Sequence, residues 1–171
     1  MAAPPIATLT LDEIAALPRG ARLMGLDLGT KTIGLALTDV DRRIATPLDT
    51  VRRTKFRADA EEVLRHAGRH GVAALVLGLP LNMDGSEGQR VQSTKAFARN
   101  LAAMTPLPIV FWDERLSTAA VTRALIEADA SRARRGEVVD RMAAAYILQG
   151  LLDRIAAIAR AQAERDGDSL P

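Results

Sequence analysis

The sequence predicts an α/β domain in which a mixed five-stranded sheet has helices on both faces. Three apolar runs joined by tight connections come first, at 23–28, 33–38 and 44–51, which is typical of an antiparallel meander. Helices and strands then alternate, which favours parallel pairing. The chain has 171 residues, enough for one such domain and too few for two large ones.

The first elements follow from local signals. Residues 1–22 form an extension in which Thr10 and Glu13 fit a capping box for a helix over 11–17, ended by Pro18. Within the meander, the third strand contains Pro47, which we expect to break it.

The later elements follow from apolar periodicity and its breakers. Helices are expected over 58–70, 89–104, 118–128 and 137–159, and strands over 75–79 and 109–112. The chain beyond residue 160 is polar, and we expect it to fray.

Composition excludes several chemistries. The chain has no cysteine, so thiol catalysis and thiolate metal sites are excluded. Its only imidazoles are His66 and His70, which we assign to an exposed helix face rather than to a metal pair. Any metal would therefore bind oxygen ligands. The formal net charge is +2, and 20 of the 23 basic residues are arginine, which favours anionic partners.

No stretch approaches the apolar length of a membrane span. The first 18 residues contain no Lys or Arg, so we expect no secretory signal or mitochondrial presequence. These two observations predict a cytoplasmic protein without a membrane partner.

Asp27 ends the first apolar strand, where a partly buried carboxylate is costly unless it is paired or bound to metal. The alternative is an aspartate that caps the following turn. Gly29 permits a sharp turn beside it, and Lys31 could contact a phosphate. Gly34, inside the second strand, indicates close approach by another backbone or by a ligand.

Two further acidic positions lie at the ends of buried elements. Asp113 and Glu114 follow the fifth strand, and in a regular strand only one of them can point into a shared site. The residues leave open which one; the other would make a supporting contact or a salt bridge with Arg115. Asp140 shares the buried stripe of the last helix, although an acid there also complements the helix dipole. The three positions together favour an oxygen-ligand site for Mg²⁺ or Mn²⁺.

Two loops frame these acids. Asn82 and Ser86 lie in the loop after the fourth strand and could touch substrate. The alternative is that Asp84 and Gly85 are only a turn and that Ser86 is the N-cap of the next helix. A basic loop precedes the helix of Asp140, which suits a phosphodiester backbone, although such a loop can also be merely solvated. Its cationic residues are Arg132, Arg134 and Arg135.

Four motifs in chain order carry a family resemblance: Asp27-x-Gly-Thr-Lys-x-Ile-Gly34, Gly78-Leu-Pro-Leu-Asn-Met-Asp-Gly85, Asp113-Glu-Arg-Leu-Ser-Thr118, and Val139-Asp140 followed by Ala143-Ala144 and Ile147-Leu148-Gln149. The chain resembles the YqgF/RuvX family. The resemblance implies an RNase H-like nuclease domain over 23–153, leaving 1–22 as the extension and 154–171 as a helix end and polar tail. Members of that family are described as Holliday junction resolvases or as nucleases that mature the 5′ end of pre-16S ribosomal RNA.

The resemblance also implies the site. Its catalytic and metal-binding acids would be Asp27, Glu114 and Asp140, so Glu114 is preferred to Asp113 on family grounds. They would hold two Mg²⁺ or Mn²⁺ ions for phosphodiester hydrolysis. Substrate contacts are expected from Lys31, Arg115, Arg132, Arg134 and Arg135, and more weakly from Thr30, Asn82 and Ser117.

The function most favoured is therefore maturation of pre-16S ribosomal RNA, with the ribosomal particle as a possible partner. The alternatives are a resolvase of branched DNA, a non-catalytic RNA-binding module, and an actin-like ATP-binding domain suggested by Asp27-x-Gly29-Thr30. The last would need two such domains around a cleft, and the length supplies one. A resolvase would be dimeric, whereas the RNA enzyme could be a monomer or a homodimer.

Overall fold

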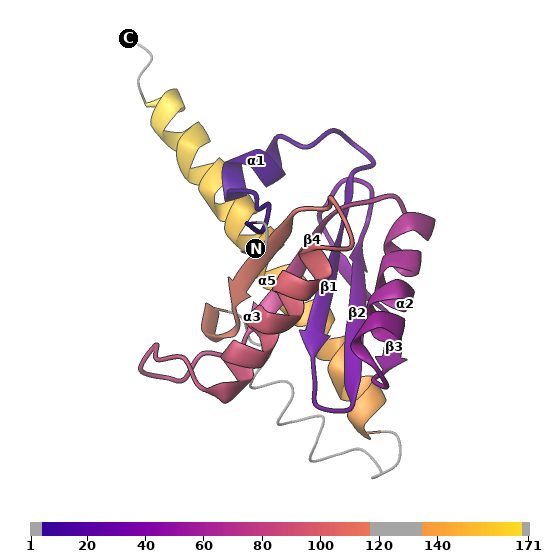
Figure 1. The fold of residues 1–171 in the computed structure, drawn as a ribbon. Coiled ribbons are helices and arrows are strands. Elements are labelled where there is room, and N and C mark those ends of the chain that lie inside the picture. The colour runs from indigo at the N-terminus through magenta and orange to yellow at the C-terminus, as the bar shows by residue number, and fades with distance from the viewer. Residues whose placement is uncertain (1–4, 117–134, 169–171) are drawn as a thin grey trace.

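A computed structural model describes residues 5–116 and 135–168, with side chains in the second range described from Val139 onward. One twisted sheet lies at the centre of the molecule (Figure 1). Helices α2 and α3 cover one face, and the long helix α5 crosses the other. The predicted mixed sheet with helices on both faces is confirmed.

The sheet has the strand order β3-β2-β1-β4-β5. The bounds are β1 Arg22–Leu28, β2 Thr32–Thr38, β3 Ala45–Arg52, β4 Val72–Leu79 and β5 Ile109–Asp113. The first three strands pair antiparallel, and β4 and β5 join in parallel. The carboxyl ends of β1, β4 and β5 therefore lie at one edge of the sheet.

The helices are α1 Leu11–Ala15, α2 Phe56–Arg69, α3 Gln89–Ala102, the 3₁₀ helix η1 Glu114–Leu116, and α5 Arg135–Gly167. The helix predicted over 118–128 lies outside the described residues. The capping box of Thr10 and Glu13 at the start of α1 is confirmed. Ile14 of this helix is fully buried against the α5 side of the sheet, so the amino-terminal extension adds to the core.

Alternation along the strands separates two cores. Met24, Leu26 and Leu28 of β1 point into the core under α2 and α3. Leu23 points to the opposite core, which is built largely from α5. Because neighbouring side chains on a strand alternate, Gly25 and Asp27 also face α5.

Pro47 does not break β3, contrary to the expectation from sequence. The strand runs through it, and the pairing with β2 shifts so that Leu35 opposes Asp49 while Ala36 opposes Pro47. Leu48 is the extra residue of this bulge. A proline is tolerated because β3 is an edge strand, where one missing N–H need not break a ladder.

His66 is buried and does not lie on an exposed helix face. It falls three residues after Val63 on the stripe of α2 that packs on the sheet, and it is 8% exposed. Its Nε2 atom lies 3.3 Å from Asp49 Oδ2 on β3. The prediction was wrong because the apolar residues around His66 set the buried stripe of this helix.

Within Val139–Gly167 of α5, an 18-residue window has a mean hydropathy of 1.4 and would qualify as a membrane span by length and composition, contrary to the expectation from sequence. The apolar residues of the first half of the helix, including Ala144, Ile147 and Leu151, are buried against the sheet. Packing in the core therefore accounts for part of this hydropathy, since 39% of the window is buried.

Candidate active site

A row of small residues crosses the sheet around Asp27. On β2, Gly34 pairs directly with Asp27. On β4, the register pairs Leu77 with Leu26, so Gly78 lies beside Asp27 one residue further along. The carboxylate of Asp27, which is 1% exposed, therefore has no side chain on either neighbouring strand at its level. These gaps leave space on the face that α5 covers.

The first described turns of α5 occupy the gap above β2. A Cβ atom at Gly34 would lie 2.0 Å from the backbone oxygen of Asp140, so no larger residue fits there. The expected close approach of another backbone at Gly34 is confirmed. The Asp140 carboxylate accepts a hydrogen bond from the Thr32 hydroxyl, and its Oδ2 atom lies 3.2 Å from where a Cβ of Gly29 would be.

Glu114 approaches the row from the other side. It begins η1 immediately after β5 and is 8% exposed. Its Oε1 atom lies 2.7 Å from the position that a Cβ of Gly78 would take. Trp112, two residues earlier, also faces the α5 core. Carboxylates from β1, from the end of β5 and from α5 thus approach one row of the sheet.

Asp113 has a different environment. Arg115 donates to it from Nε at 3.0 and 3.1 Å and from Nη2 at 2.7 Å. These hydrogen bonds hold the pKa of the Asp113 carboxyl below its usual range and raise that of the guanidinium. Asp113 therefore makes the salt bridge with Arg115 that the sequence left open. With its guanidinium on Asp113, Arg115 remains only a predicted phosphate contact.

The loop between β4 and α3 is held by its own polar groups. Asp84 accepts from the Ser86 hydroxyl at 2.6 Å and from the Ser86 N–H at 2.9 Å, and these bonds lower the pKa of Asp84. The Asn82 amide donates to the Ser86 hydroxyl at 2.9 Å. The turn expected at Asp84 and Gly85 is confirmed, whereas Ser86 is not the cap of α3, because the helix begins after Gly88 and no side chain caps it. The substrate role of Asn82 stays a prediction.

The remaining predicted contacts are less informative. Thr30 and Lys31 are exposed on the loop between β1 and β2. Ser117, Arg132 and Arg134 lie outside the described residues. Arg135 begins α5, but its side chain is not among those described.

The three acids supply the donor atoms that Mg²⁺ or Mn²⁺ prefers, and two of them are buried beside glycines. Their chemistry fits such an ion. Across 5–116 and 139–168, however, no three Asp, Glu or His side chains are grouped closely enough to hold a metal. Metal binding by Asp27, Glu114 and Asp140 therefore stays a prediction.

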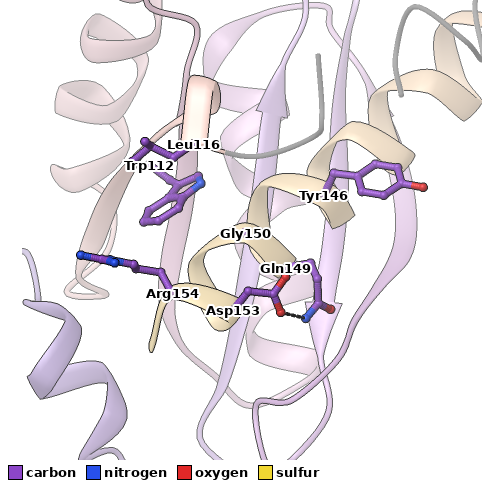
Figure 2. A pocket seen from close by; sticks show the side chains of 7 residues that line it. All are labelled: Trp112, Leu116, Tyr146, Gln149, Gly150, Asp153 and Arg154. Atoms are coloured by element: carbon purple, nitrogen blue, oxygen red, sulfur yellow. Dashed lines mark hydrogen bonds between the residues drawn. The ribbon is translucent and has the colours of Figure 1, made fainter. Parts of the chain in front are cut away.

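A cavity of about 840 Å³ lies beside this site, over the middle of α5 (Figure 2). It is lined by Trp112, Leu116, Tyr146, Gln149, Gly150, Asp153 and Arg154. The Trp112 indole nitrogen is buried and has no hydrogen-bond partner within the described part of the chain. None of the three acids of the row lines this cavity.

Some positioning residues were not identified from sequence. Gly78 was quoted only as part of a motif, and Thr32 was not singled out. The available signal was small residues on one face of three neighbouring strands: Gly25, Gly34, Ala36, Ala74 and Gly78. That signal becomes interpretable only when the strand order is known.

Comparison with known proteins decides the family. Residues 21–154 match the family described as "RuvX: Holliday junction resolvase". The chain belongs to the RuvX family. The resemblance proposed from the four motifs is confirmed, whereas the division into extension, domain and tail stays a prediction.

Individual relatives agree with this assignment. A protein of Paramagnetospirillum magneticum is 66% identical over 140 residues, which cover 82% of this chain and 90% of the relative. A protein of Beijerinckia indica is 67% identical over 135 residues, covering 79% and 82%. Both bear the name "Putative pre-16S rRNA nuclease".

A solved structure supports the fold. "T. thermophilus RuvC in complex with Holliday junction substrate" superimposes with a TM-score of 0.51 at 14% identity, covering 79% of this chain and 96% of that one. At this identity the similarity speaks for the fold alone. The RNase H-like architecture predicted from the sequence is confirmed.

Proposed function

We propose that this RuvX protein is a metal-dependent nuclease that matures the 5′ end of pre-16S ribosomal RNA. The observation that carries the proposal is the buried Asp27, set between Gly34 and Gly78, with Asp140 and Glu114 approaching on either side. The names of the relatives favour ribosomal RNA as the substrate.

The three acids would bind the metal from different elements of the fold. Asp27 would hold Mg²⁺ or Mn²⁺ from the sheet, and Glu114 and Asp140 would complete the ligand set. The bound ions supply charge stabilisation at the scissile phosphate and an activated water. The Thr32 hydroxyl orients the Asp140 carboxylate, and Gly34 and Gly78 let Asp140 and Glu114 approach the strands on either side of Asp27.

The chain's other polar groups would position the RNA. Lys31 and Thr30 project from the loop that follows Asp27, where a phosphodiester backbone would pass. Of the 171 residues only one is Trp, one Tyr and three Phe, so stacking platforms for bases are few. Recognition would depend on shape and phosphate contacts, on free RNA or on a ribosomal particle.

The test is cleavage of precursor 16S RNA with Mg²⁺ or Mn²⁺ by wild type and by Asp27→Asn. The variant removes the charge at nearly constant volume, so cleavage should fall below detection while RNA binding persists. Asp39→Asn is the matched control, because Asp39 follows the end of β2 that lies away from Asp27 and Asp140. It should cleave at the wild-type rate.

A four-way DNA junction is assayed in parallel, because the family description names that substrate. Symmetric cutting of the junction without RNA cleavage would reassign the protein as a resolvase. Binding of RNA with no cleavage of either substrate, free or on ribosomal particles, would contradict nuclease activity. Cleavage that persists in Asp27→Asn would overturn the role of the acids.

A further inference from the structure

A second cavity, of about 290 Å³, lies on the opposite side of the β1–β2 loop from the acids. It is lined by Leu28, Gly29, Thr30, Arg53, Gln89, Arg90, Ser93 and Thr94. The walls are therefore the end of β1 with its loop, the residue that follows β3, and the first turns of α3. No carboxylate is among these residues, and two guanidinium groups are.

The arginines are available to an anion. The Nη1 atom of Arg53 donates to the Gly29 carbonyl at 2.6 Å, which fixes this guanidinium at the cavity wall. Arg90 is exposed and forms no salt bridge within the described residues. Guanidinium groups bind phosphate oxygens through two parallel hydrogen bonds. Hydroxyl groups of Thr30 and Ser93 add further donors to the same space.

Gly29 forms the boundary between this cavity and the acidic site. Its carbonyl is bound by Arg53 on the cavity side. On the other side, the position that its Cβ would take lies 3.2 Å from Asp140 Oδ2. Gly29 therefore separates the cavity from the Asp140 carboxylate by a single residue, so a nucleic-acid strand that crosses Gly29 from the Asp140 side would bring a neighbouring phosphate to the cavity.

We propose that the cavity formed by Arg53, Arg90 and the Gly29–Thr30 loop binds a backbone phosphate of the substrate, next to the phosphate held at the acids. The inference that this phosphate belongs to RNA rests on the proposed function. The phosphate chemistry itself rests on the lining residues. A phosphate bound in the cavity fixes which neighbouring phosphate of the nucleic-acid strand lies at Asp27, Glu114 and Asp140.

The first experiment is an NMR titration of the full chain with inorganic phosphate in metal-free buffer. The backbone amide signals of Gly29, Thr30 and Arg90 should shift in the wild type, and this response should be lost in Arg90→Gln. The control is Arg99→Gln, an exposed arginine on the same helix. Nine residues place it about 13 Å along the helix axis and half a turn around it, so its response should match wild type.

The second experiment measures binding of labelled precursor 16S RNA without divalent metal over a range of salt concentrations. Arg90→Gln should weaken binding about tenfold at low salt. It should also make the negative slope of log K against log salt shallower by about 0.7 to 0.9. Arg99→Gln should leave the slope unchanged, and Arg90→Lys should restore most of it.

The two proposals fail separately. Phosphate shifts confined to the cavity, in a protein that cleaves neither substrate, would support the subsite while the nuclease assignment fell. An unchanged salt slope in Arg90→Gln, or phosphate shifts in the titration away from the cavity, would overturn the subsite. In that case the nuclease assignment would still rest on the Asp27→Asn result.

Discussion

The two faces of the sheet are built from residues of different size. Toward α2 and α3 the strands present large side chains such as Leu26, Leu35 and Leu77, all at most 1% exposed. Toward α5 the same strands also carry small residues, Gly25 on β1 and Gly34 on β2, among larger ones such as Leu23. Large side chains maximise buried apolar area, whereas small ones let a helix backbone reach the strands. Both faces bury an apolar core, and the α5 face in addition carries Asp27, Glu114 and Asp140.

The substitution with the largest expected effect is Gly34→Ala. Its Cβ would lie 2.0 Å from the Asp140 oxygen and 2.1 Å from the Asp140 carbonyl carbon, and these backbone atoms can move only if α5 moves. We expect a loss of about 3 kcal/mol or more in the free energy of unfolding, together with loss of cleavage. Chemical denaturation measures the first, and RNA cleavage measures the second.

Gly68→Ala is the control for that substitution. Gly68 lies in α2 and has nothing within 4 Å of its would-be Cβ. Alanine should stabilise the helix by about 0.5 to 1 kcal/mol and leave cleavage unchanged. A Gly34→Ala protein as stable as wild type would show that α5 does not sit on the sheet as described.

A pair of variants separates stability from activity. Leu101→Ala, on the buried face of α3, should cost about 2 to 5 kcal/mol but leave cleavage per folded molecule near wild type. Gly78→Ala meets only movable side-chain atoms, Ile147 Cδ1 at 2.5 Å and Glu114 Oε1 at 2.7 Å. It should cost about 1 kcal/mol and reduce cleavage at least tenfold, because Glu114 is displaced. Equal losses of activity in both variants would remove the distinction between the faces.

The smallest expected effect is on the pH dependence of the unfolding free energy, through Asp39 in the loop between β2 and β3. N–H groups of Ile44 and Arg43 donate to the Asp39 carboxylate at 2.9 and 2.7 Å and hold its pKa below the ordinary value of 3.8. Because the folded pKa is lowered, this stabilisation is complete above pH 3.8 and is lost as the pH falls through the folded value. Asp39→Asn should cost at most about 1 kcal/mol at pH 7.

The measurement is the unfolding free energy of wild type and Asp39→Asn at pH 7 and at steps below pH 4. The difference between them should shrink as the pH falls. A difference that is constant with pH would mean that the charge of Asp39 contributes nothing to the loop.

Much of the fold was predictable because its signals are local. Glycine and proline mark the strand ends, and the capping box of Thr10 predicted the short helix later found as α1. The placement of Gly34 against a backbone was also foreseeable, because a glycine inside an apolar strand often marks a close approach. Pro47 was misjudged because a bulge depends on the partner strand, which the local sequence does not specify.

The site was predictable only in part. Alternation could not choose between Asp113 and Glu114, because it applies only while the strand is regular, and β5 gives way to η1 at that point. His66 was misplaced because its burial depends on which face of α2 packs on the sheet, which the local sequence does not specify. Cavities formed between elements, such as the one at Arg53 and Arg90, have no sequence signature of their own.

The bulge at Pro47 also affects how copies of the molecule meet. An edge strand with regular spacing is a template on which a second chain can add its own strand, which is the first step toward ordered aggregates. Along β3 that template is interrupted, because proline offers no N–H and the extra residue shifts the repeat. Growth of an intermolecular sheet from this edge is therefore disfavoured.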